Sequence, residues 1–219
     1  MAAALLFDLD GTLLDTDPIH AAVFREVFAA RDREISEGFY ADHIHGRLNA
    51  DIFAEYFPDE DPQAVADEKE AAFRARLGDS AAPMPGLPGL ISRAQRKGWR
   101  LAVVTNAPRL NAEAMLGAIG MADTFEAVVI GDDLRHGKPH PEPYLAAMDW
   151  LGVAARDCIA FEDSRSGVES ASAAGAHTIG IRSTLSDDQL RHVGAAATIA
   201  DFEDPALSTH LERLTGVIP

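Results

Sequence analysis

The fold of this chain is decided by the stretch Leu5-Leu6-Phe7-Asp8-Leu9-Asp10-Gly11-Thr12. Its apolar first part, residues 3–7, has the length and composition of a short buried strand, and a carboxylate follows at once. In an extended segment, residues two apart point to the same side, so Asp8 and Asp10 can share one site. Two like charges so close need a cation between them or a proton on one of them. Solvated aspartates in a turn at the strand end are the alternative, and the stretch alone leaves both interpretations open.

The charge of the chain limits the partners that it can bind. Of its 219 residues, 25% are charged, and the formal net charge is -16 at pH 7. Nucleic acids and anionic membranes require a basic face, so we predict neither as a partner. A small anionic substrate remains compatible, because a metal ion and one or two basic side chains can reverse the field at a site.

The cysteine content and the N-terminal residues bear on the compartment. A single cysteine, Cys158, excludes a disulfide within the chain, and its apolar neighbours indicate a small buried side chain rather than a catalytic thiol. The apolar run that ends before Asp8 has no basic residue ahead of it and is too short for a signal or transmembrane segment. We therefore expect a soluble, reduced protein of the cytoplasm.

Residues 15–81 have the pattern of an all-helical unit. Apolar residues recur at spacings of three and four, and helices are expected near residues 17–28, 36–42, 50–56 and 61–77. In the last of these, Lys69 stands among acidic residues, which predicts a solvated helix face. Residues 81–89 are rich in proline and glycine and are expected to form a linker.

Beyond the linker, strand and helix patterns alternate. Strands are expected at residues 101–105, 127–130, 158–161, 177–181 and 197–199, and helices at 110–119, 141–151, 166–174 and 205–214. Alternation of this kind implies a parallel sheet covered by helices. The strand at residues 3–7 stands apart from this series, with the helical unit between. We therefore predict an α/β fold with a doubly wound, Rossmann-like sheet, in which residues 1–14 and 82–219 form the core and residues 15–81 an inserted helical cap.

Polar residues follow four of the predicted strands. In doubly wound sheets, ligands bind beyond the carboxyl ends of the strands. Carboxylates there suit Mg²⁺, while a lysine and a hydroxyl can hold phosphoryl oxygens. A carboxylate nucleophile beside a metal ion and a phosphate clamp is equipped for phosphoryl transfer through an aspartyl phosphate. The side chains expected at this edge are Asp8, Asp10, Thr105, Asn106, Lys138, Glu162 and Asp163.

Four segments resemble the sequence motifs of the haloacid dehalogenase superfamily, and they occur in the order typical of that family. The helical insertion resembles the small cap of some members, and the similarity is greatest to the branch of β-phosphoglucomutases and sugar phosphatases. This resemblance implies a Mg²⁺-dependent enzyme with the fold predicted above. The four segments are Asp8-Leu9-Asp10-Gly11-Thr12, Val104-Thr105-Asn106, Lys138-Pro139 and Phe161-Glu162-Asp163-Ser164.

The resemblance also implies roles for the residues at the strand ends. Asp8 would be the nucleophile that takes the phosphoryl group, and Asp10 would be the general acid and then the general base. Thr105 and Lys138 would bind the phosphoryl group. The presence of Asp10 favours phosphate esters over carbon–halogen bonds as substrates. The metal ligands implied are Asp8, Asp10 through its backbone carbonyl, Asp163, and Glu162 directly or through water.

Substrate choice is expected to lie with the cap, because the chemistry of the core is common to the family. Gly46 would let the backbone approach a ligand, and Arg47 could hold a second anionic or polyol group. His43 and His45 lack a third nearby ligand for zinc, and His140 is expected to shape its loop rather than bind a ligand. The candidates for substrate binding are His20, by analogy with the family, His45, Gly46, Arg47 and, in the core, Asn106.

The sequence therefore predicts a phosphatase that hydrolyses small phosphate monoesters, such as sugar or polyol phosphates, with Mg²⁺ as its cofactor. A mutase of the β-phosphoglucomutase kind is the alternative, because it shares the core residues and differs in how its cap excludes water. A catalytically silent binding protein is disfavoured, since Asp8, Asp10 and Lys138 are all present. The expected partner is a small phosphorylated metabolite, and the protein itself is expected to be a monomer or a small homo-oligomer.

Overall fold

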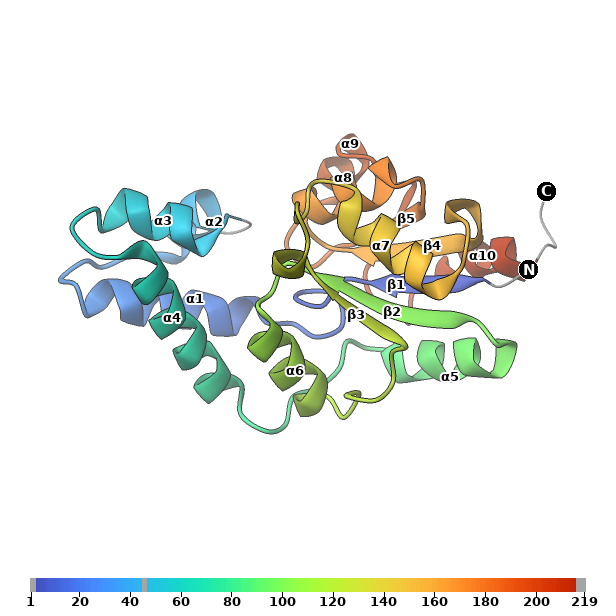
Figure 1. The fold of residues 1–219 in the computed structure, drawn as a ribbon, viewed down its shortest axis with the longest axis horizontal. Helices are drawn as coiled ribbons and strands as arrows, with labels where there is room; N and C mark the ends of the chain where they lie inside the picture. Colours follow the sequence, from blue (N-terminus) through green and yellow to red (C-terminus); the bar gives the residue numbers. More distant parts are fainter. Residues whose placement is uncertain (1–2, 45–46, 216–219) are drawn as a thin grey trace. The chain divides into compact units, whose positions relative to one another are not determined.

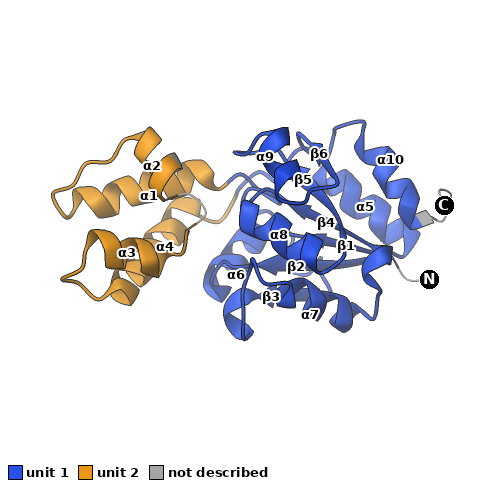
Figure 2. Cartoon of the chain, turned by 90° about the horizontal axis from the view of Figure 1, so that it is seen from above, with its two compact units in different colours: residues 1–15, 81–219 blue, residues 16–80 orange. Residues whose placement is uncertain are grey.

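The computed structural model describes residues 3–44 and 47–215 of the chain. Contacts within the chain divide it into two compact units, which are coloured separately in Figure 2. The core unit comprises Met1–Asp15 and Ala81–Pro219, and the cap unit comprises Thr16–Ser80. The borders of the units lie one residue away from the borders expected from the sequence.

The core unit is built on a parallel sheet (Figure 1). Within the described residues the strands form one six-stranded sheet in the order β3-β2-β1-β4-β5-β6, and all neighbouring strands are parallel. The α/β class and the doubly wound sheet predicted from the sequence are confirmed. The strands are β1 (Ala4–Phe7), β2 (Arg100–Thr105), β3 (Ala127–Ile130), β4 (Cys158–Glu162), β5 (His177–Ile181) and β6 (Ala197–Ile199).

Strand β1 lies at the centre of the sheet and decides where a ligand is expected. It pairs with β2 on one side and with β4 on the other. The chain builds the sheet outward from β1 to β3 and then, on the other side, from β4 to β6. The strand order therefore reverses between β1 and β4. In doubly wound sheets, a binding crevice lies at such a reversal, beyond the carboxyl ends of the strands.

Helices cover the sheet, and two of them, α5 and α9, were not expected from the sequence. Helix α9 is short, and the sequence signal for it is a capping box in which Ser186 and Gln189 bond each other's backbone N–H groups. The 3₁₀ turns are η1 (Gly131–Asp133), η2 (Ala155–Asp157) and η3 (Arg213–Thr215). The helices of the core unit are α5 (Leu87–Lys97), α6 (Arg109–Ala118), α7 (Glu142–Leu151), α8 (Arg165–Ala173), α9 (Asp187–His192) and α10 (Leu207–Glu212).

The linker predicted over residues 81–89 is wrong at its end. Helix α5 starts at Leu87, because a proline such as Pro88 is tolerated in the first turn of a helix, where its missing N–H is not needed. The linker stops at Gly86, which has a φ of +77°. A Cβ at this position would lie 2.5 Å from the carbonyl carbon of Phe202, so both the conformation and the close approach require glycine.

The two faces of β1 are covered by different side chains, as the alternation along a strand requires. Leu6 lies on one face, in a buried cluster with residues of α7 and α8 that include Tyr144. On the other face, Phe7 stacks on Phe161 with 5.1 Å between the ring centroids. All four residues of β1 are buried, so the strand end that precedes Asp8 is fixed by packing on both sides.

The cap unit consists of four helices within its described residues. Aromatic side chains form its interior: the ring centroids of Phe24 and Phe53 lie 5.7 Å apart, and those of Phe28 and Phe57 lie 4.9 Å apart. No helix in the described part of either unit is long and apolar enough to cross a membrane. The helices are α1 (Asp17–Ala29), α2 (Glu37–His43), α3 (Asn49–Tyr56) and α4 (Pro62–Leu77).

The prediction that Lys69 lies on a solvated helix face is wrong. Lys69 is only 2% exposed, and its Nζ lies 2.9 Å from Glu70 Oε1 and 2.9 Å from His20 Nδ1. Its position in α4 explains the burial, because Val65 precedes it and Phe73 follows it at the spacing of four that forms one helix face. Because acidic residues flank Lys69 in the sequence, its position on the apolar stripe of α4 is hard to recognise from the sequence alone.

Candidate active site

The end of β1 brings Asp8 beside the end of β4. Phe7 pairs with Phe161 in the sheet, so the residues that follow them, Asp8 and Glu162, lie at the same level on neighbouring strands. The Asp8 N–H donates to the Phe161 carbonyl oxygen over 2.9 Å, which fixes the backbone at this point. Asp8 is 7% exposed and Glu162 is fully buried. Two carboxylates are thus held close together with little access to water.

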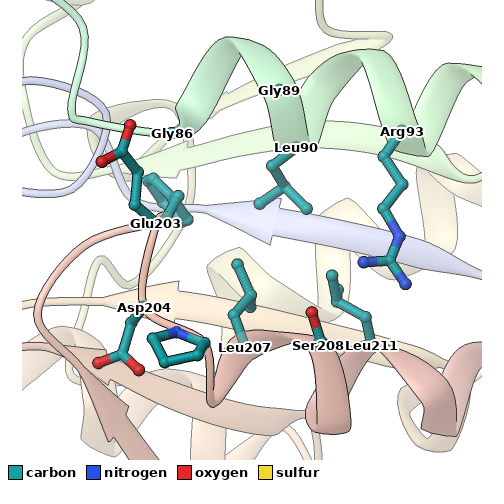
Figure 3. A pocket seen from close by; sticks show the side chains of 11 residues that line it. Gly86, Gly89, Leu90, Arg93, Glu203, Asp204, Leu207, Ser208 and Leu211 are labelled. Carbon is teal, nitrogen blue, oxygen red and sulfur yellow. The ribbon is translucent and has the colours of Figure 1, made fainter.

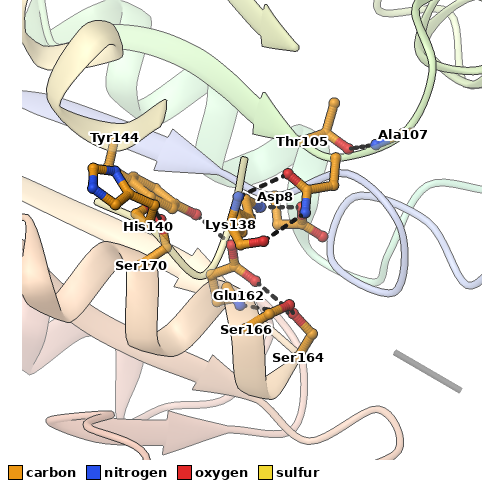
Figure 4. A network of polar contacts seen from close by, with 12 residues as sticks. Asp8, Thr105, Ala107, Lys138, His140, Tyr144, Glu162, Ser164, Ser166 and Ser170 are labelled. Carbon is orange, nitrogen blue, oxygen red and sulfur yellow. Dashed lines mark hydrogen bonds and ion pairs between the residues drawn. The ribbon is translucent and has the colours of Figure 1, made fainter. Parts of the chain in front are cut away.

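The ammonium group of Lys138 lies between these two carboxylates (Figure 4). Its Nζ is 2.5 Å from Asp8 Oδ1 and 2.5 Å from Glu162 Oε1. Burial alone lowers the pKa of a lysine, but the two carboxylates outweigh it and hold the pKa of Lys138 above its usual value. Burial raises the pKa of Asp8 to about 8, against the opposing effect of the Lys138 ammonium group. One ammonium group does not neutralise two carboxylates, so the cluster holds a proton or needs a further cation.

Glu162 is held in place by donors from three side chains. Besides Lys138, Tyr144 Oη donates to Glu162 Oε1 over 2.5 Å, and Ser164 Oγ donates to Oε2 over 3.4 Å. Burial, with the added charge of Glu162, holds the pKa of Tyr144 well above its usual value, so the phenol stays protonated and donates. A Cβ at Gly167 would lie 1.8 Å from Glu162 Oε2, so only glycine leaves room for this carboxylate. These contacts fix the negative charge that faces Lys138.

Asn106 fixes the loop that carries Lys138. Its Nδ2 donates to the Lys138 carbonyl oxygen over 3.1 Å, and the Lys138 N–H donates back to Asn106 Oδ1 over 3.0 Å. The loop approaches so closely that a Cβ at Gly137 would lie 2.9 Å from Asn106 Oδ1. The structure thus gives Asn106 a role in holding the loop, and its role in substrate binding stays a prediction.

Thr105 lies at the end of β2 and is 1% exposed. Its Oγ1 accepts a hydrogen bond of 2.9 Å from the Ala107 N–H, as the dashed line in Figure 4 shows. A hydroxyl that accepts through its oxygen can still donate its proton, and a phosphoryl oxygen needs such a donor. The turn that this bond closes leads directly into α6, which begins at Arg109.

Asp163 completes a group of carboxylates that suits a divalent cation. Asp8, Glu162 and Asp163 each offer one oxygen, and these oxygens lie within 4.8 Å of one another. Ser183 Oγ donates to Asp163 Oδ2 over 2.8 Å, which orients this carboxylate. Gly11, with a φ of +69°, permits its close approach, because a Cβ there would lie 1.9 Å from Asp163 Oδ2. Hard oxygen donors with a surplus of negative charge are the ligands that Mg²⁺ prefers, so the residues present fit this ion.

Comparison with known proteins identifies the family of the chain. The family model described as haloacid dehalogenase-like hydrolase matches residues 5–181, a range that contains Asp8, Lys138 and Asp163. The chain belongs to this family. It is therefore a hydrolase of the haloacid dehalogenase superfamily, and the resemblance noted in its four sequence segments is confirmed.

Several relatives of this hydrolase match it over nearly their whole length. It is 35% identical over 185 residues to the fructose-1-phosphate phosphatase YqaB of Escherichia coli K12, covering 82% of this chain and 96% of the relative. It is 31% identical over 210 residues to a phosphorylated carbohydrates phosphatase of Thermotoga maritima, covering 91% and 95%. The crystal structure of CbbY from Rhodobacter sphaeroides in complex with phosphate matches with a TM-score of 0.80 at 29% identity, covering 92% and 95%.

The cap residues predicted to bind substrate are only partly described. His45 and Gly46 lie outside the described residues. Arg47 is exposed, and its Nη2 lies 2.7 Å from Glu55 Oε2 within the cap unit. An exposed ion pair of this kind adds little to stability because water screens it, so it would yield readily to an anionic ligand. The role of Arg47 in substrate binding stays a prediction.

His20, the remaining cap candidate, lies in a contact network of the cap unit. Its ring stacks on Phe73 with 4.2 Å between the ring centroids, and its Nδ1 faces the buried ammonium group of Lys69. The structure thus shows how His20 is oriented within the cap. Its contact with a substrate stays a prediction.

Sequence reasoning missed two residues of the core site, Tyr144 and Ser183. The signal for Tyr144 is a hydroxyl on the face of α7 that is otherwise formed by apolar residues such as Ala147 and Leu151. Ser183 follows the end of β5, a strand end whose polar residues were not included in the predicted site. Both hydroxyls donate to carboxylates, so their task is to orient Glu162 and Asp163.

A separate cavity of about 240 Å³ lies between α5 and α10 (Figure 3). Leu90, Leu207 and Leu211 are among its lining residues, and Arg93 and Glu203 contribute charge. Its lining includes none of the residues described above that surround Lys138 and the carboxylate group. It is therefore not the candidate active site.

Replacement of Tyr144 by phenylalanine tests the anchoring of Glu162. Tyr144→Phe keeps the packing of the ring but leaves Glu162 Oε1 without its phenolic donor, which should lower the free energy of unfolding by about 1–3 kcal/mol. Because the charge facing Lys138 is then less firmly placed, we expect a drop in kcat of roughly tenfold, which corresponds to about 1.4 kcal/mol, with little change in KM. Denaturant unfolding and steady-state kinetics measure the two effects.

A matched control for this variant is Tyr56→Phe in the cap unit, where the side chain is half-buried. Its effect on unfolding should stay within about 0.5 kcal/mol, as for most surface changes. An unchanged kcat in Tyr144→Phe, or an equal loss in both variants, would contradict the positioning role.

Proposed function

We propose that this hydrolase is a Mg²⁺-dependent phosphatase that cleaves small phosphate monoesters, namely sugar or polyol phosphates, through an aspartyl-phosphate intermediate. The observation that carries the proposal is the place of Asp8. Its carboxylate lies against the ammonium group of Lys138, and one of its oxygens lies within 4.8 Å of a carboxylate oxygen of Asp163. A nucleophile close to both a fixed cation and a cation-binding carboxylate is equipped to attack a phosphoryl group.

Four side chains of the core unit have separate roles in the proposed reaction. Asp8 attacks the phosphorus and breaks its bond to the ester oxygen, which leaves as the alcohol after taking a proton from Asp10. Lys138 and Thr105 hold the phosphoryl oxygens and offset the charge that develops on them. Asp10, now deprotonated, takes a proton from a water molecule that attacks the aspartyl phosphate. Inorganic phosphate and the original carboxylate of Asp8 result.

We assign the metal ion to the carboxylate group at the ends of β1 and β4. Asp8, Asp163 and the backbone carbonyl of Asp10 would hold it directly. Glu162 would contribute directly or through water; its Oε1 already accepts hydrogen bonds from Lys138 and Tyr144, which leaves Oε2 as the oxygen nearer to free for this task. When bound, the ion supplies positive charge that lowers the pKa of Asp8 and offsets charge on the phosphoryl group.

The relatives support the proposed class of substrate, and the cap is proposed to select within it. The relatives from Escherichia coli and Thermotoga maritima are named for phosphatase activity on fructose 1-phosphate and on phosphorylated carbohydrates. We propose that His20, His45, Gly46 and Arg47 of the cap select among such compounds, with Arg47 binding a second polar or anionic group. The partner is then a small phosphorylated metabolite, handled in the cytoplasm by a monomer or a small homo-oligomer.

Phosphate release across a panel of sugar, polyol and two-carbon phosphates tests this function. We expect release that requires Mg²⁺ and stops with EDTA, with the highest kcat/KM for a sugar or polyol phosphate. A mutase would instead interconvert sugar phosphate isomers and depend on a catalytic amount of sugar bisphosphate, which ³¹P NMR of the same reactions detects. Isomer exchange that outpaces phosphate release would overturn the proposal in favour of the mutase.

A further inference from the structure

Two histidines of the loop that joins η1 to α7 lie close to the glutamate that begins α7. His136 Nδ1 lies 2.9 Å from Glu142 Oε2, and His140 Nδ1 lies 3.9 Å from the same oxygen. The two imidazole rings stack with 4.4 Å between their centroids. One ligand atom from each of the three residues lies within 4.8 Å of the others. This cluster is separate from the carboxylate group of the active site.

The backbone that carries these side chains is held at several points. Asn106 bonds both the N–H and the carbonyl group of Lys138, and the His140 N–H donates to the Gly137 carbonyl oxygen over 3.0 Å. The Ser170 hydroxyl donates to the His140 carbonyl oxygen over 2.6 Å. Glu142 is the first residue of α7, so the helix fixes its backbone as well. The three side chains are thus presented from an ordered frame, which reduces the entropy lost on binding a ligand.

The donor set favours a borderline transition metal over Mg²⁺. Two imidazoles and one carboxylate suit Zn²⁺, whereas Mg²⁺ prefers oxygen ligands and retains its waters. The side chains of His136 and His140 are about half exposed, so a metal ion can reach them and complete its coordination with water. The net charge of -16 also raises the concentration of cations near the surface.

We propose that His136, His140 and Glu142 form a binding site for Zn²⁺. The ion would replace the 2.9 Å contact between His136 and Glu142, and the 3.2 Å hydrogen bond that His140 Nδ1 accepts from the Glu142 N–H. Lys138 lies between His136 and His140 in the sequence. A bound ion would therefore connect the two ends of the loop segment that carries this lysine. This proposal departs from the expectation that His140 shapes its loop rather than binds a ligand, and it does not depend on which phosphate ester is the substrate.

Calorimetric titration of Zn²⁺ into the untagged protein tests this site. Excess Mg²⁺ is present throughout to occupy the carboxylate group of the active site. We expect one Zn²⁺ per chain, and a loss of affinity of at least about tenfold in each of His136→Ala and His140→Ala, with a smaller loss in Glu142→Gln. Zn²⁺ should also raise the Tm of the wild type and shift the imidazole ¹⁵N signals of both histidines.

Two further variants make the outcome decisive. His192→Ala removes an exposed histidine of α9 and should bind Zn²⁺ like the wild type, whereas a similar loss there would show non-specific imidazole binding and overturn the proposal. Asp163→Asn weakens the active-site cation position and should leave the Zn²⁺ titration unchanged. Absence of Zn²⁺ binding, unaltered binding in both His136→Ala and His140→Ala, or loss in Asp163→Asn alone would each overturn it.

Discussion

Asp8→Asn is expected to abolish turnover, with kcat reduced by at least about 10⁴-fold, because the amide cannot take the phosphoryl group. The fold should remain, since asparagine has nearly the same volume and Lys138 keeps its contact with Glu162. Phosphate release with excess Mg²⁺ measures the first effect, and circular dichroism checks the second. Asp149→Asn on the exposed side of α7 is the matched control and should retain full activity.

The same variant has a pH-dependent effect on stability in EDTA. Burial raises the pKa of Asp8 to about 8, so the folded protein holds the proton on Asp8 more tightly than the unfolded chain does. The stabilisation from this proton is complete below about pH 4 and is lost as the pH rises through about 8. Asparagine does not ionise, so Asp8→Asn should gain free energy of unfolding relative to the wild type between about pH 5 and pH 9.

Urea unfolding of both proteins at several pH values measures this difference. Mg²⁺ should reduce it at high pH, because the ion stabilises the ionised carboxylate of the wild type. Turnover retained by Asp8→Asn would show that Asp8 is not the nucleophile. A stability difference that does not change with pH would show that Asp8 is ionised throughout, even without a metal ion.

The sheet could be predicted from the sequence because its strands have a local signal. Parallel strands are buried on both faces and form short apolar runs, and β5 and β6 begin and end where the sequence indicates. The position of the polar residues after these strands can be predicted from the same pattern, because the carboxyl ends of parallel strands lie at one edge of the sheet. Asp8 and Glu162 could therefore be placed together before their contact with Lys138 was known.

Two of the features that were not predicted, the surroundings of Lys69 and of Asn106, involve contacts between distant segments. Lys69 lies on the apolar stripe of α4, but its ammonium group lies against His20 in α1, which is 49 residues away in the sequence. The hydrogen bonds of Asn106 join the end of β2 to the loop of Lys138, 32 residues away in the sequence. This contact cannot be recognised from the sequence, where an asparagine at a strand end suggests a ligand contact instead. The start of α5 was concealed by Pro88, which indicates a loop in general but is compatible with a first helical turn.

Lys138→Met is expected to cost both stability and activity. Methionine fills the space of the lysine stem but leaves the buried carboxylates of Asp8 and Glu162 without their shared ammonium group. Removing one partner of a buried ion pair typically destabilises a protein by about 3–5 kcal/mol, because a charge is left without compensation. Turnover should fall by at least about 10³-fold, since the phosphoryl group also loses a cation that holds its oxygens.

A second substitution separates these two losses. In Lys138→Met/Glu162→Gln one of the two carboxylates is gone, while Oε1 of the glutamine can still accept the hydrogen bond from Tyr144. The double variant should therefore recover at least about 1–2 kcal/mol of the free energy of unfolding lost in Lys138→Met, as a coupling energy measured in a double-mutant cycle. Its turnover should stay as low as that of Lys138→Met, because the missing ammonium group is not replaced. Recovery of activity together with stability would show that Lys138 acts only as a counter-charge in the fold, whereas recovery of stability alone means that its charge serves both the buried carboxylates and the phosphoryl group.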